Sequence, residues 1–403
     1  MFRDKARCPF PRASGGALSP KRRENPPAVT FPRLVLEVAT VRALTSPFLF
    51  TASAPDCQDL LKHELTVGSS FRLAFSRPGL VTFKSDHPLS LSEPRRSRLA
   101  TLEGLSLGGA KTLPELIALL ERALGDARCP EGDAEPPPAH DALETAQTET
   151  WTLAVHPWPV AEDEEPTSED RLAEARQAIE NAWPLERRRG AFEVGILVPP
   201  VDRAHFGYFA FLRPLGASAP AAKVIPPSEA PSRAYSKLVE ALEHFQLSLT
   251  PGSSALELGA APGGATFALL ERGISVIAVD PAEMGPTLAS YARSRGLLLQ
   301  HIKKPAQAID GKDLPRLSSA PRYLISDMNV APPVSAQYVL RARSLIKSSL
   351  DVAILTLKLN DTAALDALPR VLAELERAFG QPPQTAHLPS HRREIVAVLQ
   401  RRP

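Results

Sequence analysis

A short glycine-rich turn between two apolar runs limits the fold of this chain more than any other feature of its sequence. The stretch LELGAAPGGATFALLERGISVIAVD runs from Leu256 to Asp280. Residues 255–258 are mostly apolar and predict a buried strand, whereas the β-branched residues 275–279 predict the next parallel strand. Residues 266–271 predict a helix between them. The unit is therefore strand, turn, helix and strand.

This unit predicts a ligand site. It places the turn and Asp280 at the carboxyl ends of neighbouring strands, where open α/β sheets bind their ligands. Glycines let the backbone approach a ligand closely, and a carboxylate can accept both hydroxyls of a ribose. The spacing G-A-A-P-G-G differs from the dinucleotide motif G-x-G-x-x-G. We therefore expect a nucleoside cofactor, S-adenosylmethionine (SAM) rather than a nicotinamide, with a purely structural glycine turn as the alternative.

Helices and apolar strands alternate regularly from residue 232 to the C-terminus. Strands are predicted at residues 322–328, 351–359 and 394–400. A helix is predicted at residues 363–379, and we expect Pro369 to interrupt it. These elements extend the predicted α/β sheet.

Four ionisable side chains stand out in this part of the chain. Asp327 and Lys358 lie at the ends of predicted strands, Glu394 begins the last strand, and Lys237 lies on a helix. Taken singly, Lys237, Asp327 and Glu394 are most simply solvated charges. Lys358 is less easily explained in this way, because it lies in the apolar run AILTLKL, and a buried lysine is costly unless it is paired or deprotonated.

The composition divides the chain, whose length suits two or three domains. An Arg-, Pro- and Gly-rich N-terminal segment is expected to be disordered, and two small α+β units, a linker and the α/β domain follow it. The second α+β unit contains a Pro- and acid-rich insertion. The expected boundaries are residues 1–45, 46–105, 106–215, 216–231 and 232–403.

Charge is spread unevenly along the chain. Residues 131–170 contain twelve Asp and Glu and no Lys or Arg. Because the net charge of the whole chain is +2, the remainder carries +14. Such an excess is compatible with a polyanionic partner such as RNA.

The cysteines and the hydropathy pattern favour a reducing compartment. The three cysteines, Cys8, Cys57 and Cys129, have neither metal-ligand spacing nor the pattern of a disulfide framework. No apolar run reaches the length of a membrane span, and the N-terminus lacks the apolar core of a secretory signal. We therefore expect a cytoplasmic protein with no metal site and no membrane partner. The sequence makes no prediction of the oligomeric state.

Five ordered blocks resemble one known family. They read APSRAYSKLVEALEHF, LGAAPGGATFALLERGISVIAVDPAEM, ISDM, LTLKL and LPSHRREIVAVL. They are similar to the ribosomal RNA large-subunit methyltransferase M family over roughly residues 206–400. The resemblance implies a Rossmann-like, FtsJ-like SAM methyltransferase domain that methylates the ribose 2′-hydroxyl of a cytidine in 23S ribosomal RNA. It also implies that small α+β, THUMP-like RNA-binding domains precede that domain.

The resemblance also implies a Lys-Asp-Lys-Glu tetrad, which falls on Lys237, Asp327, Lys358 and Glu394. Our hypothesis is that Lys358 draws the proton from the hydroxyl, and that Lys237 and the apolar strand lower the pKa of Lys358. Asp327 would orient Lys358 and face the methionyl end of SAM, and Glu394 would orient a lysine or the ribose. The implied SAM contacts are Gly259, Ala261, Pro262, Gly263, Gly264, Asp280 and Asp327.

The chain departs from the family at some positions. The family has tryptophan at Ala265 and serine at Ala234, and its acid for the adenine falls here on Lys304 or Pro305. A non-catalytic RNA-binding protein that keeps a SAM fold is therefore one alternative. A nicotinamide oxidoreductase and a 2′-O-methyltransferase for another RNA are the others.

Overall fold

The computed structural model describes residues 45–401, apart from several segments between and within the elements. These segments are residues 92, 94, 95, 126–151, 162, 163, 183–191, 201–206, 215–221, 315–319, 347 and 348. The expected disordered N-terminus, most of the acidic insertion and the start of the expected linker lie outside the described residues. No helix among the described residues is long and apolar enough to cross a membrane.

The N-terminal part contains a mixed sheet with the strand order β2-β3-β1-β4-β7-β6-β5. Neighbouring strands are antiparallel except β5 and β6, which are parallel. The strands are β1 (Thr45–Ala52), β2 (Phe71–Arg77), β3 (Leu80–Ser90), β4 (Leu102–Ala110), β5 (Thr152–Pro157), β6 (Phe192–Val198) and β7 (Tyr208–Pro214). The helices are η1 (Pro55–Cys57), α1 (Gln58–Thr66), α2 (Leu113–Gly125) and α3 (Glu169–Ala182).

Hydrophobic side chains cover both faces of this sheet. Leucines of α1 and α2 pack with Leu49 and Phe83 on one face. On the other face the rings of Phe50 and Phe211 stack with their centroids 4.0 Å apart. The boundary that we expected between residues 105 and 106 falls inside β4, so the two expected α+β units share one continuous sheet.

The C-terminal part contains the predicted α/β sheet, with the strand order β10-β9-β8-β11-β12-β14-β13. The strands are β8 (Ser254–Leu258), β9 (Ser275–Val279), β10 (Leu299–Ile302), β11 (Tyr323–Ser326), β12 (Val352–Lys358), β13 (Gln384–Ala386) and β14 (Glu394–Gln400). The helices are α4 (Ala234–His244), α5 (Gly264–Glu271), α6 (Leu288–Ser294), η3 (Ala306–Ala308), α7 (Pro332–Ile346) and α8 (Thr362–Phe379). The first five strands in this order are parallel, and β14 is antiparallel to both β12 and β13.

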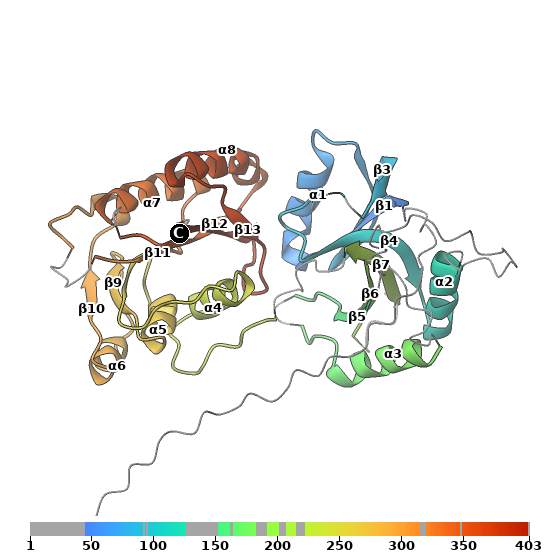
Figure 1. Cartoon of the computed structure of the whole chain (residues 1–403), viewed down its shortest axis with the longest axis horizontal. Helices are drawn as coiled ribbons and strands as arrows, with labels where there is room; N and C mark the ends of the chain where they lie inside the picture. Colours follow the sequence, from blue (N-terminus) through green and yellow to red (C-terminus); the bar gives the residue numbers. More distant parts are fainter. Residues whose placement is uncertain are drawn as a thin grey trace, which may run out of the picture. The chain divides into compact units, whose positions relative to one another are not determined.

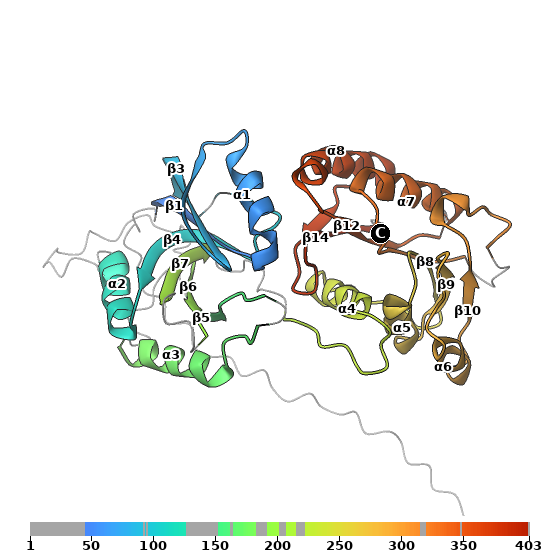
Figure 2. The ribbon, with the colours of Figure 1, turned by 180° about the vertical axis from the view of Figure 1, so that it is seen from behind.

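Helices cover both faces of this sheet, as Figures 1 and 2 show for α7 and α8 on one face and α4, α5 and α6 on the other. Alternate strand residues face opposite layers. Leu256 of β8 packs with the core under α7 and α8, whereas its neighbour Ala255 packs with the core under α4 and α5. Because both faces are covered, the inner strands β9, β11 and β12 are mostly apolar and buried.

The strand order reverses between β8 and β11, which places two chain segments side by side at the carboxyl ends of these strands. Leu258 lies opposite both Val279 and Ser326 in the register. Gly259 and Asp327 therefore leave the sheet next to each other. The position of the glycine turn was thus predicted correctly from the sequence.

The expected interruption of the last long helix is wrong. Helix α8 continues through Pro369 to Phe379 and ends at Gly380, which has a φ of 76°. Proline removes one backbone hydrogen bond, but buried side chains on both sides of it, Leu365 and Val371 among them, anchor the helix to the core. The Asp361 side chain also caps the first turn by accepting a hydrogen bond from the backbone N–H of Ala364 at 2.8 Å.

We predict that Gly264→Ala destabilises the protein. Alanine is ordinarily favoured over glycine in a helix by up to about 1 kcal/mol. Here, however, a Cβ would lie 2.4 Å from Ser232 Oγ and 2.6 Å from the Ser232 carbonyl oxygen. Overpacking of this kind costs about 1–3 kcal/mol of the free energy of unfolding, which urea denaturation measures. Gly311→Ala is the control, since no heavy atom lies within 4 Å of its added Cβ, and an equal stability of both variants would contradict the close approach.

We predict that Glu257 makes the stability of the protein depend on pH. Its side chain is buried in β8 and accepts a hydrogen bond from Thr266 Oγ1 at 2.6 Å. Burial, and to a lesser extent the nearby Asp327 and Asp280, raise the pKa of Glu257 to about 8. The carboxyl is therefore protonated in the folded chain at neutral pH.

Because the pKa of Glu257 is higher in the folded than in the unfolded chain, its stabilising contribution is complete at acidic pH. That contribution is lost as pH rises from the unfolded pKa of about 4.3 through the folded value. Urea unfolding at several pH values measures this, with Glu257→Gln as the variant that does not titrate. The stability of wild type minus that of the variant should fall as pH rises across this window, and a constant difference would show that Glu257 does not titrate there.

Candidate active site

The four ionisable side chains singled out in the sequence lie together at one edge of the second sheet. The antiparallel register of β12 and β14 pairs Lys358 directly with Glu394. Asp327 follows the end of the neighbouring strand β11, and Lys237 extends toward the same edge from α4. Three strands and one helix thus supply one side chain each.

Each lysine of the cluster contacts both carboxylates. Lys358 Nζ donates a hydrogen bond of 2.7 Å to Asp327 Oδ1 and another of 2.7 Å to Glu394 Oε1. Lys237 Nζ lies 3.3 and 3.4 Å from the two carboxylate oxygens of Asp327. Its contact with Glu394 Oε2, at 2.7 Å, has the geometry of an ion pair rather than a hydrogen bond. The result is a ring in which positive and negative groups alternate.

The ring determines the protonation of its members. Burial raises the pKa of Asp327, but the charges of Lys237 and Lys358 and their hydrogen bonds outweigh it and hold that pKa below its ordinary value. Burial lowers the pKa of Lys358, but Asp327 and Glu394 outweigh it and raise the pKa above the ordinary value. In the ligand-free chain, both Asp327 and Lys358 are therefore charged at neutral pH.

Our expectation of a lowered pKa for Lys358 is therefore wrong for the ligand-free chain. That expectation of a lowered pKa took into account only the apolar strand and the second lysine, Lys237. The structure adds two carboxylates in direct contact with the ammonium, and opposite charges at this distance favour the charged form. To act as a base, Lys358 would first have to give up its ammonium proton.

The glycine turn connects β8 to α5 beside this cluster. Gly259 has a φ of 75°, and a Cβ there would lie 2.8 Å from the carbonyl oxygen of Asp327. A side chain is excluded because the two strand ends approach so closely. The Asp280 carboxylate accepts hydrogen bonds from the backbone N–H groups of Ala261 at 3.1 Å and Ala282 at 2.8 Å. Asp280 thus ties the turn to the end of β9.

The remaining turn residues have distinct surroundings. Pro262 accepts a hydrogen bond from the Gly285 N–H at 2.8 Å, and Gly263 has a φ of 109°. Gly264 packs against the start of α4 at Ser232. Since α4 carries Lys237, the glycine that begins α5 also sets the position of one member of the charged cluster.

The region expected to contact an adenine contains paired lysines. Lys304 follows β10 and pairs with Asp313, and Lys303 pairs with Glu283. Through its ion pair, Lys304 brings the carboxylate of Asp313 to the loop in which the family's acid falls on Lys304 or Pro305. The ion pairs of these four residues join them to one another and not to the charged cluster.

Three buried polar residues escaped the sequence analysis. Glu257 lies in a buried apolar strand, which is the signal that drew attention to Lys358. Glu240 is fully buried on α4 and accepts hydrogen bonds from the N–H and the hydroxyl of Ser390 at 2.8 and 2.6 Å. His391 follows directly, and its ring is buried near the charged cluster. Nothing in the local pattern reveals the last two residues, because only the fold brings α4 and this loop together.

Comparisons with known proteins agree with this architecture. Residues 230–378 match the model of the family described as FtsJ-like methyltransferase. The matched range includes the glycine turn and three of the four clustered residues, and Glu394 lies beyond it.

Curated relatives share sequence with part of the chain. A ribosomal RNA large subunit methyltransferase M of Laribacter hongkongensis is 34% identical over 191 residues, which is 43% of this chain and 49% of that protein. The protein of the same name from Proteus mirabilis is 31% identical over 185 residues, or 43% of this chain and 47% of that protein. The chain thus spans about half the length of these relatives.

A solved structure gives a weaker similarity. Aeropyrum pernix fibrillarin in complex with S-adenosyl-L-methionine aligns with a TM-score of 0.32 at 19% identity, covering 41% of this chain and 76% of that protein. The family match comes from the sequence of residues 230–378, and the sheet order and the glycine turn observed there accord with it. Residues 230–378 thus form a domain that matches the FtsJ-like methyltransferase family.

Proposed function

We propose that the protein transfers a methyl group from SAM to a ribose 2′-hydroxyl of RNA, and that the target is a cytidine of 23S ribosomal RNA. The observation that carries this proposal is the largely buried ring of Lys237, Asp327, Lys358 and Glu394 beside the glycine turn. The name of the curated relatives, ribosomal RNA large subunit methyltransferase M, supports the class of substrate.

The glycine turn fits the proposed cofactor. Gly259 and Gly263 have positive φ and carry no side chain, so a ligand can approach the backbone of the turn closely. Each carboxylate oxygen of Asp280 accepts one backbone hydrogen bond, so each keeps a lone pair for a ribose hydroxyl. In this proposal, residues 259–264 surround the methionyl part, Asp280 binds the ribose, and Asp327 faces the methionyl end.

The charged cluster fits the proposed chemistry. A ribose hydroxyl becomes a useful nucleophile only when its proton is drawn off. Bound SAM supplies the methyl group, and its positive sulfonium lowers the pKa of nearby lysines. Once its ammonium has released a proton to solvent, Lys358 accepts the hydroxyl proton on Nζ, while Asp327 and Glu394 keep that atom in place. Lys237 remains as the second cation, so that the two carboxylates stay balanced.

Residues 46–215 supply RNA binding in this proposal, as THUMP-like α+β domains. The excess of positive charge outside the acidic segment 131–170 supports a polyanionic partner. Phosphate contacts would make RNA binding weaken steeply with salt, because they release counterions.

We predict that Asp280→Ala weakens SAM binding. The variant removes the acceptor for the ribose and releases the Ala261 N–H that orders the turn. Loss of a hydrogen bond to a charged group is worth about 1.5–3 kcal/mol, so the Kd should rise about tenfold to hundredfold. Isothermal titration calorimetry measures this, with Glu376→Ala on the exposed face of α8 as the control. Equal SAM affinity of wild type and Asp280→Ala would reject the assigned site.

We predict that Lys358→Ala and Lys358→Arg abolish methyl transfer while SAM binding persists. The rate should fall about 10²–10⁴-fold, the usual effect of removing a general base. Arginine keeps the positive charge but stays protonated. The assay follows tritium from SAM into 23S ribosomal RNA that lacks the modification, and Lys312→Arg on the exposed surface is the control.

The pH dependence adds a second readout. Because the pKa of Lys358 is raised in the free protein, the wild-type kcat/KM should keep rising as pH increases into the alkaline range. Wild-type turnover by Lys358→Arg would assign Lys358 a positioning role instead. A wild-type chain that binds SAM and RNA without transferring tritium would overturn the proposed activity and indicate a non-catalytic RNA-binding protein.

A further inference from the structure

A small cavity lies directly beneath the charged cluster, on the face of the sheet that α4 covers. Thr356 precedes Lys358 by two residues in β12, and Val396 follows Glu394 by two residues in β14, so both side chains lie one layer below the cluster. Together with Lys237, Ser326 and His391 they line the cavity. It leaves about 10 Å³ for the centre of a water-sized sphere, which is room for about one water molecule.

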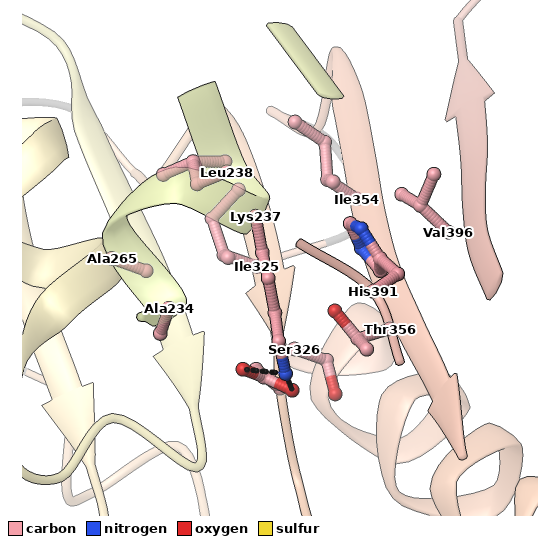
Figure 3. Close-up of a pocket in the computed structure, with 11 residues that line it drawn as sticks. Ala234, Lys237, Leu238, Ala265, Ile325, Ser326, Ile354, Thr356, His391 and Val396 are labelled. Atoms are coloured by element: carbon pink, nitrogen blue, oxygen red, sulfur yellow. Dashed lines mark hydrogen bonds and ion pairs between the residues drawn. The ribbon is translucent and has the colours of Figure 1, made fainter. Parts of the chain in front are cut away.

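The imidazole ring of His391 lines this cavity, and its two nitrogens make no hydrogen bond to the described residues. His391 is 1% exposed. Figure 3 shows His391 and Thr356 on the side of β12 and β14, facing the extended side chain of Lys237. Two hydrogen bonds from Ser390 to Glu240 of α4 fix the residue that precedes His391. The imidazole is therefore held in place by the same helix that carries Lys237.

The imidazole is neutral. Burial lowers the pKa of His391 well below its ordinary value, and the positive charges of Lys237 and Lys358 and the neighbouring His387 lower it further. Only Asp327 acts in the opposite direction. A neutral imidazole has one nitrogen that donates and one that accepts a hydrogen bond.

Lys237 can present one donor on this side. An ammonium group has three N–H donors. The two long contacts of Lys237 with Asp327, at 3.3 and 3.4 Å, can share one N–H, and Glu394 Oε2 faces a second, which leaves the third for the cavity. Ser326 Oγ, which also lines the cavity, has no hydrogen-bond partner among the described residues. A buried water needs two to four polar partners, and the cavity offers that number.

We propose that the cavity binds one water molecule, which accepts a hydrogen bond from Lys237 and donates one to His391, and that His391 is thereby a positioning residue for the tetrad. The part of this inference that concerns catalysis rests on the proposed function. The water site gives the two lysines different surroundings, because Lys358 is absent from the described residues that line the cavity. The water thus fixes the position of Lys237, whereas Lys358 is the lysine left to exchange a proton.

Three variants and a control test the catalytic part with the full-length protein. His391→Phe keeps a ring of similar size but removes both nitrogens, and His391→Gln restores a donor and an acceptor. Thr356→Val removes a hydroxyl from the cavity wall without changing its shape. His87→Phe, exposed on β3, is the matched control.

His391→Phe should lower kcat about tenfold to hundredfold, the effect of leaving a buried donor unpaired. The KM for SAM should stay within about twofold, since His391 does not touch the cofactor in the proposed site. His391→Gln should recover most of the loss, and His87→Phe should match wild type. Equal kcat values for His391→Phe and wild type, or no recovery in His391→Gln despite an intact fold, would overturn the positioning role.

Crystal structures test the water site independently of activity. The wild-type full chain should show one water within about 3 Å of both Lys237 Nζ and a His391 nitrogen. The same density should be lost in His391→Phe. A dry cavity, or a direct contact between His391 and Lys237, would overturn the proposal. If wild type shows this water but transfers no methyl group, the proposed function fails and the water site stands.

Discussion

The pairing of two buried lysines with two partly buried carboxylates is the constraint on which the second half of this structure depends. Any one of these charges would be expensive to bury alone, and removing one partner of a buried pair leaves an uncompensated charge. Lys237, Asp327, Lys358 and Glu394 are tolerated because each cation contacts both anions. The elements that carry them are therefore fixed relative to one another. The same arrangement gives the edge of the sheet a set of charges that respond to any ligand bringing a further charge.

The fold brings these charges together with the glycine turn by simple means. The reversal of strand order places Gly259 against the backbone of Asp327, and Gly264 lets α5 pack closely against the start of α4. Asp280 orders the turn from the next strand through the Ala261 N–H. The turn and the cluster are thus two parts of one framework. A change in the turn is transmitted to Lys237 through the contact between α4 and α5.

Much of this framework could be predicted from the sequence, and the failures have physical causes. Apolar runs and the turn residues predicted the five inner strands of the second sheet, whereas the short edge strands β10 and β13 were missed. An ionisable residue in an apolar strand identified Lys358. Pro369 was misjudged because tertiary packing on both sides outweighs one lost hydrogen bond. The pKa of Lys358 was misjudged because it depends on Asp327 and Glu394, which lie 31 and 36 residues away. His391 was missed because only the folded loop places it beneath the cluster.

The direct pairing of Lys358 with Glu394 across β12 and β14 has a consequence for biosynthesis. A shift of one residue in this pairing would turn every side chain of β14 to the opposite face, leaving Lys358 buried without one of its anions. The pairing of Lys358 with Glu394 therefore favours the observed register of β12 and β14 over a shifted one. Glu394 in β14 follows the other three members of the cluster along the chain, so a nascent polypeptide completes the cluster only once β14 has left the ribosome. Until then, the two lysines have the single carboxylate of Asp327 as their partner within the cluster.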